Sequence, residues 1–274
     1  MESFVQIVSG AQPLRDTSLE VRLARDALDR RAAQRLRYRV FVTELGARGA
    51  MVDHAVRLER DRFDRVCDHL LLVDPCRDPA TLDHVVGAYR LLPGTRAERF
   101  GGFYSEAEYD LTPLKRSRRR LLELGRSCVD PAYRNGPAIL LLWNGLADYV
   151  LARGIEVLFG VASFHGTDPQ GLRVPLSWLH HHHLAPPPLR VRARPERFQR
   201  MDLLPAEALE REAALAQIPG LIRGYLRAGG HVGEGAFVDH AFNTVDVALV
   251  MDTALMSARR RAFLARTPRP AALP

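Results

Sequence analysis

Short apolar segments and one long amphipathic segment alternate through the middle of the chain. Strands are predicted where short segments are apolar, or alternate apolar with polar residues, between Pro, Gly or Asp. These segments cover residues 19–24, 69–73, 85–92, 121–129 and 155–162. Residues 133–153 have apolar positions near helical spacing and stop at Gly154, which predicts a helix. A strand–helix–strand unit after a meander indicates an α/β fold, in which a helix packs on a mixed sheet.

The flanking segments extend this pattern. A helix rich in Ala, Leu and Arg is predicted over residues 26–45, ended by Gly46, and the polar stretch 48–68 is expected to be irregular. Further helices are expected at 171–183 and 206–217. Residues 236–240 and 244–250 predict a strand pair that closes the sheet, residues 218–226 are ambiguous, and Pro186 to Pro188 predict an extended turn.

No linker divides the chain into two domains. We expect a flexible N-terminus over residues 1–17, a single domain over 18–255 and a basic tail over 256–274. Within the domain, residues 206–255 are interpreted as a C-terminal elaboration that closes the sheet.

Composition narrows the class of protein. With 274 residues, 47% of them hydrophobic and 26% charged, the chain is not wholly disordered. Lys and Arg number 39 against 32 Asp and Glu, and this net charge of +7 predicts attraction to nucleic acid, an anionic membrane or an acidic protein. No membrane-spanning run or secretory signal is seen, and the three separated cysteines suit a reducing compartment, so a cytoplasmic location is expected.

The turn between the strand at 121–129 and the following helix is the first candidate site. Its backbone N–H groups at the helix N-terminus are free to bind a pyrophosphate or a phosphopantetheine arm, and Arg134 adds charge. An ordinary strand-to-helix turn is the alternative interpretation.

Residues of this turn resemble the acyl-donor loop of the GNAT acyltransferase superfamily. The loop pattern Arg/Gln-x-x-Gly-x-Gly/Ala corresponds to Arg134-Asn135-Gly136-Pro137-Ala138, one residue shorter than usual. The shorter spacing fits branches that take acyl groups from acyl carrier protein. The resemblance implies a GNAT-like acyl-CoA N-acyltransferase fold. It assigns Arg126, Arg134, Asn135, Gly136 and Ala138 to the phosphopantetheine arm of the carrier, with no permanently bound cofactor.

Four further segments resemble acyl-homoserine-lactone synthases, which transfer acyl groups from acyl carrier protein to an amino-acid amine. They are Arg37-Tyr38-Arg39-Val40-Phe41 with Glu44-Leu45-Gly46, Asp61-Arg62-Phe63-Asp64, Tyr89-Arg90-Leu91-Leu92-Pro93-Gly94-Thr95, and Glu123 with Arg126. The resemblance implies substrate contacts for Arg37, Phe41, Asp61, Asp64 and Arg90. Ala47 departs from the pattern, since those synthases have tryptophan there.

A sister group, the ornithine-acyltransferase family, matches more of the chain, over roughly residues 19–250. The matching segments include Asp68-His69-Leu70, Phe103-Tyr104-Ser105-Glu106, Leu142-Trp143-Asn144-Gly145-Leu146, Phe159 to Gly166, Ile222 to Arg227 and Phe242-Asn243-Thr244-Val245-Asp246-Val247. The resemblance implies transfer of a 3-hydroxyacyl group from acyl carrier protein to the α-amine of L-ornithine, giving lyso-ornithine lipid.

Two other functions are alternatives to this one. A signal synthase that makes an acyl-homoserine lactone is disfavoured by Ala47 and by the extra C-terminal segment. A non-enzymatic module that binds membrane or nucleic acid would cluster its arginines among aromatic residues. The arginines of this chain are spread along it, so nucleic acid is not expected as a partner.

An amine that attacks a thioester needs a proton acceptor and donors for the developing oxyanion. Glu123 is the candidate base, and the backbone N–H groups near Val129 are the expected oxyanion donors. A structural Glu123–Arg126 ion pair is the alternative role for this carboxylate. It would require a bulge, because a spacing of three residues puts the two side chains on opposite faces of a flat strand.

The acceptor and the carrier each need charged partners. Asp61 and Asp64 are candidates for the side-chain ammonium of ornithine, with plain solvation as the alternative, and Ser105 and Glu106 are expected near the amino acid. Acidic acyl carrier protein is expected to meet Arg37, Arg126, Arg134 and the basic run at 115–120, which is otherwise a solvated loop.

The segment around residues 178–188 suggests other contacts. Consecutive histidines, His180 to His183, point in different directions on a helix, so no metal site is predicted. Trp178 and Leu179 suit either domain packing or a membrane surface. A product destined for lipid favours peripheral contact with the anionic inner face of the cytoplasmic membrane.

Overall fold

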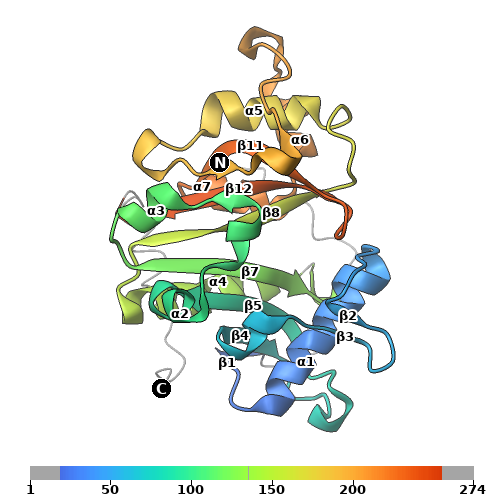
Figure 1. Ribbon diagram of the computed structural model, residues 1–274. Coiled ribbons are helices and arrows are strands. Elements are labelled where there is room, and N and C mark those ends of the chain that lie inside the picture. The colour runs from blue at the N-terminus through green and yellow to red at the C-terminus, as the bar shows by residue number, and fades with distance from the viewer. Residues whose placement is uncertain (1–18, 135, 255–274) are drawn as a thin grey trace, which may run out of the picture.

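Ten strands form one mixed sheet within residues 19–134 and 136–254, the part of the chain that the computed structural model describes (Figure 1). In order across the sheet they are β1 (Glu20–Leu23), β4 (Asp68–Val73), β5 (Val85–Pro93), β7 (Leu121–Val129), β8 (Val157–His165), β12 (Thr244–Asp252), β11 (His231–Asp239), β9 (Arg192–Ala193) and β6 (Tyr109–Asp110), with β10 (Phe198–Gln199) paired to β11. β7 runs parallel to β8 and β9 to β11, whereas the other neighbours are antiparallel. β2 (Val52–Asp53) and β3 (Leu58–Glu59) form a separate hairpin.

Helices cover both faces of the sheet. One face carries α1 (Ala27–Arg37), which continues as a π-helical segment (Tyr38–Glu44), together with α2 (Gly94–Phe100) and α3 (Thr112–Arg116). The other face carries α4 (Ala138–Arg153), α5 (Arg173–His183), α6 (Arg211–Gln217) and α7 (Gly220–Arg227). Short 3-10 turns lie at Arg62–Arg65, Pro79–Thr81, Tyr104–Ala107, Pro131–Tyr133, Pro187–Leu189, Pro195–Arg197 and Ala206–Ala208.

The central strands are apolar on both sides because both faces of the sheet are covered. In β4, Leu70 and Leu72 join the cluster under α4, whereas Leu71 and Val73 join the cluster under α1. Successive side chains of a strand point to opposite faces, so an uninterrupted apolar run is what a doubly covered strand requires. For this reason a polar residue within such a strand marks a position with a special environment.

Local sequence signals set the ends of the principal helices. The Asp26 side chain accepts the backbone N–H of Asp29 at 2.9 Å and caps the start of α1. Gly46, with φ of +76°, follows the π-helical segment, and Gly154, with φ of +58°, ends α4. Both glycines therefore take the left-handed conformation that a helix C-terminus favours.

Most of the predicted elements are present. β1, β4, β5, β7 and β8 lie where the apolar pattern placed strands, and the long helix after β7 is α4. The helix predicted over 26–45 forms in two parts, α1 and the π-helical segment, and the ambiguous stretch 218–226 is mostly α7.

Several expectations need correction. The helix predicted over 206–217 is a 3-10 turn followed by α6, and Pro186 leads into another 3-10 turn rather than an extended one. The expected closing pair is β11 and β12, but β12 lies inside the sheet beside β8, and the sheet continues past β11 to β9 and β6. The flexible N-terminus and basic tail expected at 1–17 and 256–274 lie outside the described residues.

Among the helices that the structure describes, none has both the length and the apolarity needed to cross a bilayer.

Candidate active site

The two parallel central strands separate partway along their length, and a cavity occupies the gap. β7 and β8 are paired from Leu121 with Val157 to Leu124 with Gly160, and beyond this point each strand continues without the other. A Cβ atom on Gly160 would lie 2.2 Å from the backbone oxygen of Leu124, so a side chain there would force the strands apart. The cavity has a volume of about 310 Å³ and is lined by residues on both sides of this gap.

A bulge in β7 directs a charged side chain toward the cavity. Against β5, Cys128 pairs with Ala88 and Gly125 with Arg90, so Arg126 and Ser127 together face the single residue between them. Arg126 has φ of +51°, in the left-handed region that a non-glycine residue adopts at an energetic cost. The strained backbone is therefore what brings this guanidinium to the site.

Glu123 is buried in the cavity wall, with a relative exposure of 4%. Its carboxylate accepts the backbone N–H groups of Tyr104 at 2.9 Å and Ser105 at 2.7 Å, and also the Ser105 hydroxyl. Burial raises the pKa of Glu123, while these hydrogen bonds oppose the rise. The bulge required for a Glu123–Arg126 pair is present, yet Arg126 bonds to Glu59 and to the Tyr104 hydroxyl instead.

Three arginines and three carboxylates form a buried ionic network behind this wall. The Arg37 guanidinium holds both oxygens of Asp64 at 2.7 Å and pairs with Glu59. Arg90 holds both oxygens of Asp61 at 2.7 Å, and Arg126 reaches Glu59 at 3.1 Å. Burial opposes the ionised form of Asp64, but the Arg37 guanidinium, together with Arg90 and His69, more than offsets it and lowers the pKa of that carboxyl.

This network changes the roles expected for three residues. Asp61 and Asp64 are held by Arg90 and Arg37, and they are not among the described residues that line the cavity, where ornithine was expected to meet them. Arg37 is 1% exposed, so the contact with acyl carrier protein expected of it is wrong. Phe41, Arg90, Arg126 and Ser105 do line the cavity.

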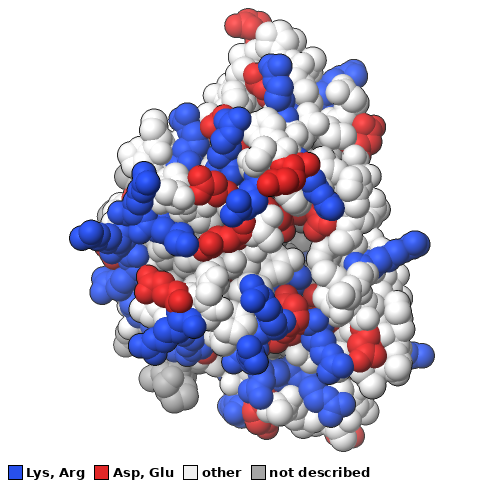
Figure 2. Space-filling view, viewed as in Figure 1, with Lys and Arg blue, Asp and Glu red and all other residues white. Residues whose placement is uncertain are grey.

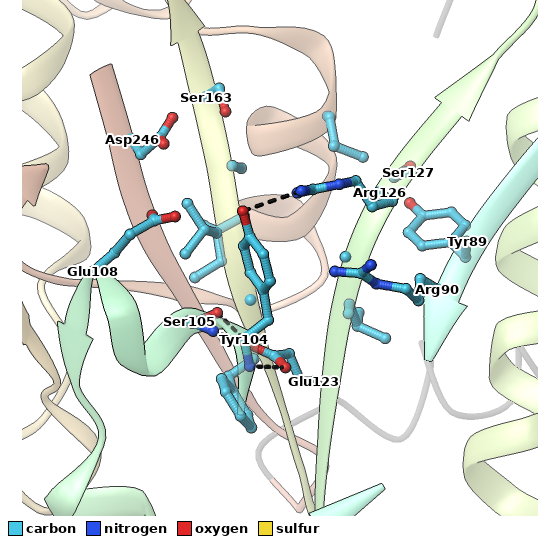
Figure 3. Close-up of a pocket in the computed structure, with 18 of the residues that line it drawn as sticks. Tyr89, Arg90, Tyr104, Ser105, Glu108, Glu123, Arg126, Ser127, Ser163 and Asp246 are labelled. Carbon is cyan, nitrogen blue, oxygen red and sulfur yellow. Dashed lines mark hydrogen bonds between the residues drawn. The ribbon is translucent and has the colours of Figure 1, made fainter. Parts of the chain in front are cut away.

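A group of carboxylates that the sequence did not single out faces the same cavity. Candidate ligand atoms of Glu108, Asp239 and Asp246 lie within 4.8 Å of one another. Glu108 is 6% exposed and Asp246 is 4% exposed, and burial raises the pKa of each. Figure 3 shows Glu108 and Asp246 across the cavity from Arg126. One feature of the sequence could have indicated this group. Asp246 interrupts the apolar run of β12, and a buried carboxylate is unfavourable there unless its surroundings stabilise it.

The cavity has an apolar end on the opposite face of the sheet. Leu221 and Tyr225 of α7, with Leu249 and Met251 of β12, line this end. The Tyr225 hydroxyl lies 3.3 Å from that of Tyr89, which also accepts the Trp143 indole N–H at 3.2 Å. The cavity has a charged end and an apolar end because side chains alternate along each strand. Asp246 points to one face of the sheet, whereas its neighbours Val245 and Val247 point to the other.

The turn that leads into α4 follows the C-terminal end of β7. Arg134 holds Glu44 through contacts of 2.6 and 2.7 Å and donates to the Val129 carbonyl at 3.0 Å. Among the described residues, no side chain caps the N-terminus of α4, where Ala138 is 1% exposed and Gly136 is partly buried. Val129 is itself buried and is absent from the described cavity lining. Asn135, expected to bind the carrier arm, lies outside the described residues.

Two other sets of expected residues face away from the cavity. Glu106 pairs with Lys115 at 3.1 Å and lines a second, open hollow with the basic run at 115–120. Figure 2 shows basic side chains gathered over α2 and α3, where this run lies. The run precedes β7 and the carrier loop follows it, so the strand separates them by about 26 Å at roughly 3.3 Å per residue. The basic run directly precedes the Glu123 strand, as expected, and lies at the opposite end of β7 from the loop.

Comparison with known proteins is consistent with this geometry. Residues 36–144 match the family model described as an acetyltransferase (GNAT) domain. The L-ornithine N(alpha)-acyltransferase of Rhodobacter capsulatus is 63% identical over 249 residues, covering 91% of this chain and 95% of that protein. Its counterpart from Brucella abortus is 46% identical over 244 residues, covering 88% and 87%.

Solved structures are similar at lower identity. A CoA-dependent acyl-homoserine lactone synthase has a TM-score of 0.46 at 17% identity, covering 86% of this chain and 80% of that one. An N-acyl amino acid synthase from uncultured soil microbes has a TM-score of 0.46 at 10% identity, covering 88% and 94%.

The mixed sheet, the separated parallel strands and the matched domain define an acyltransferase of the GNAT type, which confirms the expected fold class. Within that class, identities of 44–63% over most of the chain decide the family. This chain belongs to the L-ornithine N(alpha)-acyltransferase family, as the sequence motifs indicated.

Proposed function

We propose that this enzyme transfers a 3-hydroxyacyl group from acyl carrier protein to the α-amine of L-ornithine, giving lyso-ornithine lipid. The observation that carries the proposal is one cavity with a charged end and an apolar end, which meet where β7 and β8 separate. A fatty acyl thioester and a polar amino acid need such an arrangement in order to meet. The names of the relatives supply the acceptor and the position of acylation.

The thioester is placed at the gap between the two strands. The backbone N–H of Asp130 donates to Val86 on β5, and strand alternation then directs the Val129 N–H toward the side that β8 has left. This position suits Val129 as a donor to the developing oxyanion, although the cavity lining stops short of it. The acyl tail then extends among Leu221, Leu249 and Met251.

Glu123 is the proposed base for the attacking amine. Its carboxylate faces the cavity, and its raised pKa brings its basicity closer to the working pH than that of an ordinary glutamate. The Tyr104 and Ser105 groups that bond to it fix the direction of its oxygens. The proton leaves the ammonium for Glu123 directly or through a water molecule, the amine then attacks the thioester carbon, and the carrier thiol departs.

The phosphopantetheine arm is proposed to lie along the end of β7, with its phosphate at the N-terminus of α4. Backbone N–H groups at a helix N-terminus attract an anion, and the exposed Arg134, which is paired with Glu44, precedes them in the chain. Gly136 and Ala138 leave room for the arm because neither carries a large side chain.

The direct test combines purified protein with 3-hydroxyacyl-acyl carrier protein and ornithine, followed by mass spectrometry of the products. We expect Nα-acylated ornithine, and little product with glycine, glutamine or lysine. Parallel reactions with 3-hydroxyacyl-CoA and with a saturated acyl-acyl carrier protein test the donor. Folded protein that yields no acyl-ornithine with any of these donors would exclude the proposed acceptor.

A further inference from the structure

The carboxylates of Glu108, Asp239 and Asp246 converge on the cavity from three separate segments. Glu108 follows the 3-10 turn at Tyr104–Ala107, Asp239 ends β11, and Asp246 lies in β12. All three residues line the cavity, and their candidate ligand atoms lie within 4.8 Å of one another. Three like charges at this separation repel one another, so the group stays fully ionised only when a cation joins it, and otherwise takes up protons, as the raised pKa of Glu108 and of Asp246 indicates.

Two of these carboxylates have an oxygen with no partner in the described part of the chain. They are Oε2 of Glu108 and Oδ1 of Asp246, and both residues are more than nine-tenths buried. A buried carboxylate oxygen without a hydrogen-bond donor is costly, and proteins normally satisfy such atoms. The unsatisfied oxygens therefore indicate that a ligand with several donors completes the site.

Positive charge on the protein lies on the other side of the cavity. Arg90 and Arg126 both line it, and Figure 3 shows them opposite Glu108 and Asp246. Glu123, the proposed base, lies on β7 on the same face of the sheet as the acidic group. A ligand that spans this space meets guanidinium at one end and carboxylate at the other.

We propose that Glu108, Asp239 and Asp246 bind the side-chain ammonium of ornithine while Arg126 attracts its α-carboxylate. The inference rests on the proposed function and deepens it. The δ-nitrogen stays protonated among the three carboxylates, so it has no lone pair with which to attack. The α-amine lies nearer to Glu123 and the thioester, and selectivity for the α position follows.

A divalent metal ion is the competing occupant, and the donors present favour an ammonium. Calcium takes six to eight oxygen ligands, and magnesium keeps several waters beside one or two carboxylates. The three side chains have six oxygens, but Oδ1 of Asp239 already accepts the backbone N–H groups of Ala241 and Phe242, at 2.7 and 3.3 Å, which leaves five. An ammonium needs three acceptors, which matches one oxygen from each carboxylate.

The test compares ornithine with norvaline, which has the same carbon chain but no δ-amine. Glu108→Gln and Asp246→Asn remove charge without changing shape, and Glu207→Gln, an exposed position, is the matched control. We expect each site variant to lower kcat/KM for ornithine about 100-fold, as loss of a buried charge pair does, while norvaline turnover changes little. The control should keep the ornithine preference of the wild type.

Calorimetry of ornithine, norvaline and Mg²⁺ with each protein gives a second readout that does not depend on turnover. If Glu108→Gln fails to fold, Asp239→Asn takes its place, because an asparagine oxygen can still accept the two backbone N–H groups. If the wild type is active but the variants keep its full preference for ornithine over norvaline, this inference is wrong while the proposed function stands. Mg²⁺ binding that competes with ornithine would have the same meaning. Wild type that makes no acyl-ornithine would overturn the proposed function as well.

Discussion

Glu123 combines two requirements that conflict in an ordinary carboxylate. Three hydrogen bonds hold its oxygens in place, and each of them favours the ionised form. Burial favours the neutral form more strongly, so the pKa is raised. The residue is thus both oriented and basic, which suits proton transfer better than either property alone.

The pH dependence of activity should report this balance. Glu123 must be ionised to accept a proton, so activity should rise with pH through its raised pKa, above the 4.5 of an ordinary glutamate. Ser105→Ala removes a hydrogen bond to the ionised form and should move this rise to higher pH. Glu123→Gln should lower kcat by about 10²–10⁴-fold and abolish the rise. An unshifted profile in the serine variant would argue against Glu123 as the titrating group.

The network of Arg37, Asp64 and their partners should matter chiefly for stability. Asp64→Asn leaves buried guanidinium charge less compensated, and we expect a loss of about 3 kcal/mol in the free energy of unfolding, measured with urea. Asp53→Asn breaks the exposed pair with Arg60 and should cost less than about 1 kcal/mol. Because the pKa of Asp64 is lowered on folding, its contribution is present above the ordinary carboxyl pKa and fades as pH falls below it. Equal losses in the two variants would contradict this account.

The sequence motifs showed which residues belong to the site, but they did not show which of these residues are buried. The resemblances marked Arg37, Asp61, Asp64, Arg90 and Arg126 as important, and the structure brings these five together. The sequence could not show that they satisfy one another, since arginine and aspartate are usually exposed and the partners are far apart in the chain. The acidic group was missed for the same reason, because its members come from segments that only the tertiary fold brings together.

Among the elements, the separation of β7 from β8 creates the cavity, and its start is set by one residue. Gly160 permits the close approach to Leu124, and the pairing of the two strands stops at this point. The strands themselves were readable from their apolar runs. Their order was not, because a local pattern does not say which strand is a neighbour. The pair expected to close the sheet, β11 and β12, is instead followed by β9 and β6.

Gly160→Ala tests this element directly. Its Cβ would meet the Leu124 carbonyl at 2.2 Å, so the strands must move, and we expect a loss of about 1–3 kcal/mol in stability with a lowered kcat. Gly220→Ala is the control, because a Cβ at that position meets nothing within 4 Å, and it should change stability by less than about 0.5 kcal/mol. For each variant, thermal melting measures the stability and steady-state turnover measures kcat. A Gly160 variant as stable and active as the control would show that the gap tolerates a side chain.

On the scale of the whole molecule, the excess positive charge is not concentrated at one place. Many arginines are engaged by acidic partners, as Arg119 is by Asp252 at 2.5 Å and Arg134 by Glu44. Figure 2 shows acidic side chains interspersed among basic ones on the visible face. A general attraction to acidic partners therefore follows from the net charge, whereas the docking position must come from geometry.

Carrier docking should depend on the end of β7 rather than on its start. Arg134→Ala should weaken acyl carrier protein binding about tenfold at low salt, with the difference shrinking as salt screens the charges. The pair Arg118→Ala with Arg120→Ala, at exposed positions of the basic run, should change affinity about twofold at most. Titration by fluorescence anisotropy at two salt concentrations measures both. The reverse ranking would place the carrier over the second hollow.

The gap between β7 and β8 is closed by backbone pairing at one end and open at the other. The proposed product joins an amino acid on one face of the sheet to a fatty chain on the other. In that position it would pass through the gap, so it could not leave directly from either face. It must slide lengthwise, past the ends of both strands, which is also the side from which the proposed donor arrives. The product is therefore expected to leave through the same open end at which the next acyl carrier binds. We expect product release to precede binding of the next donor in each turnover.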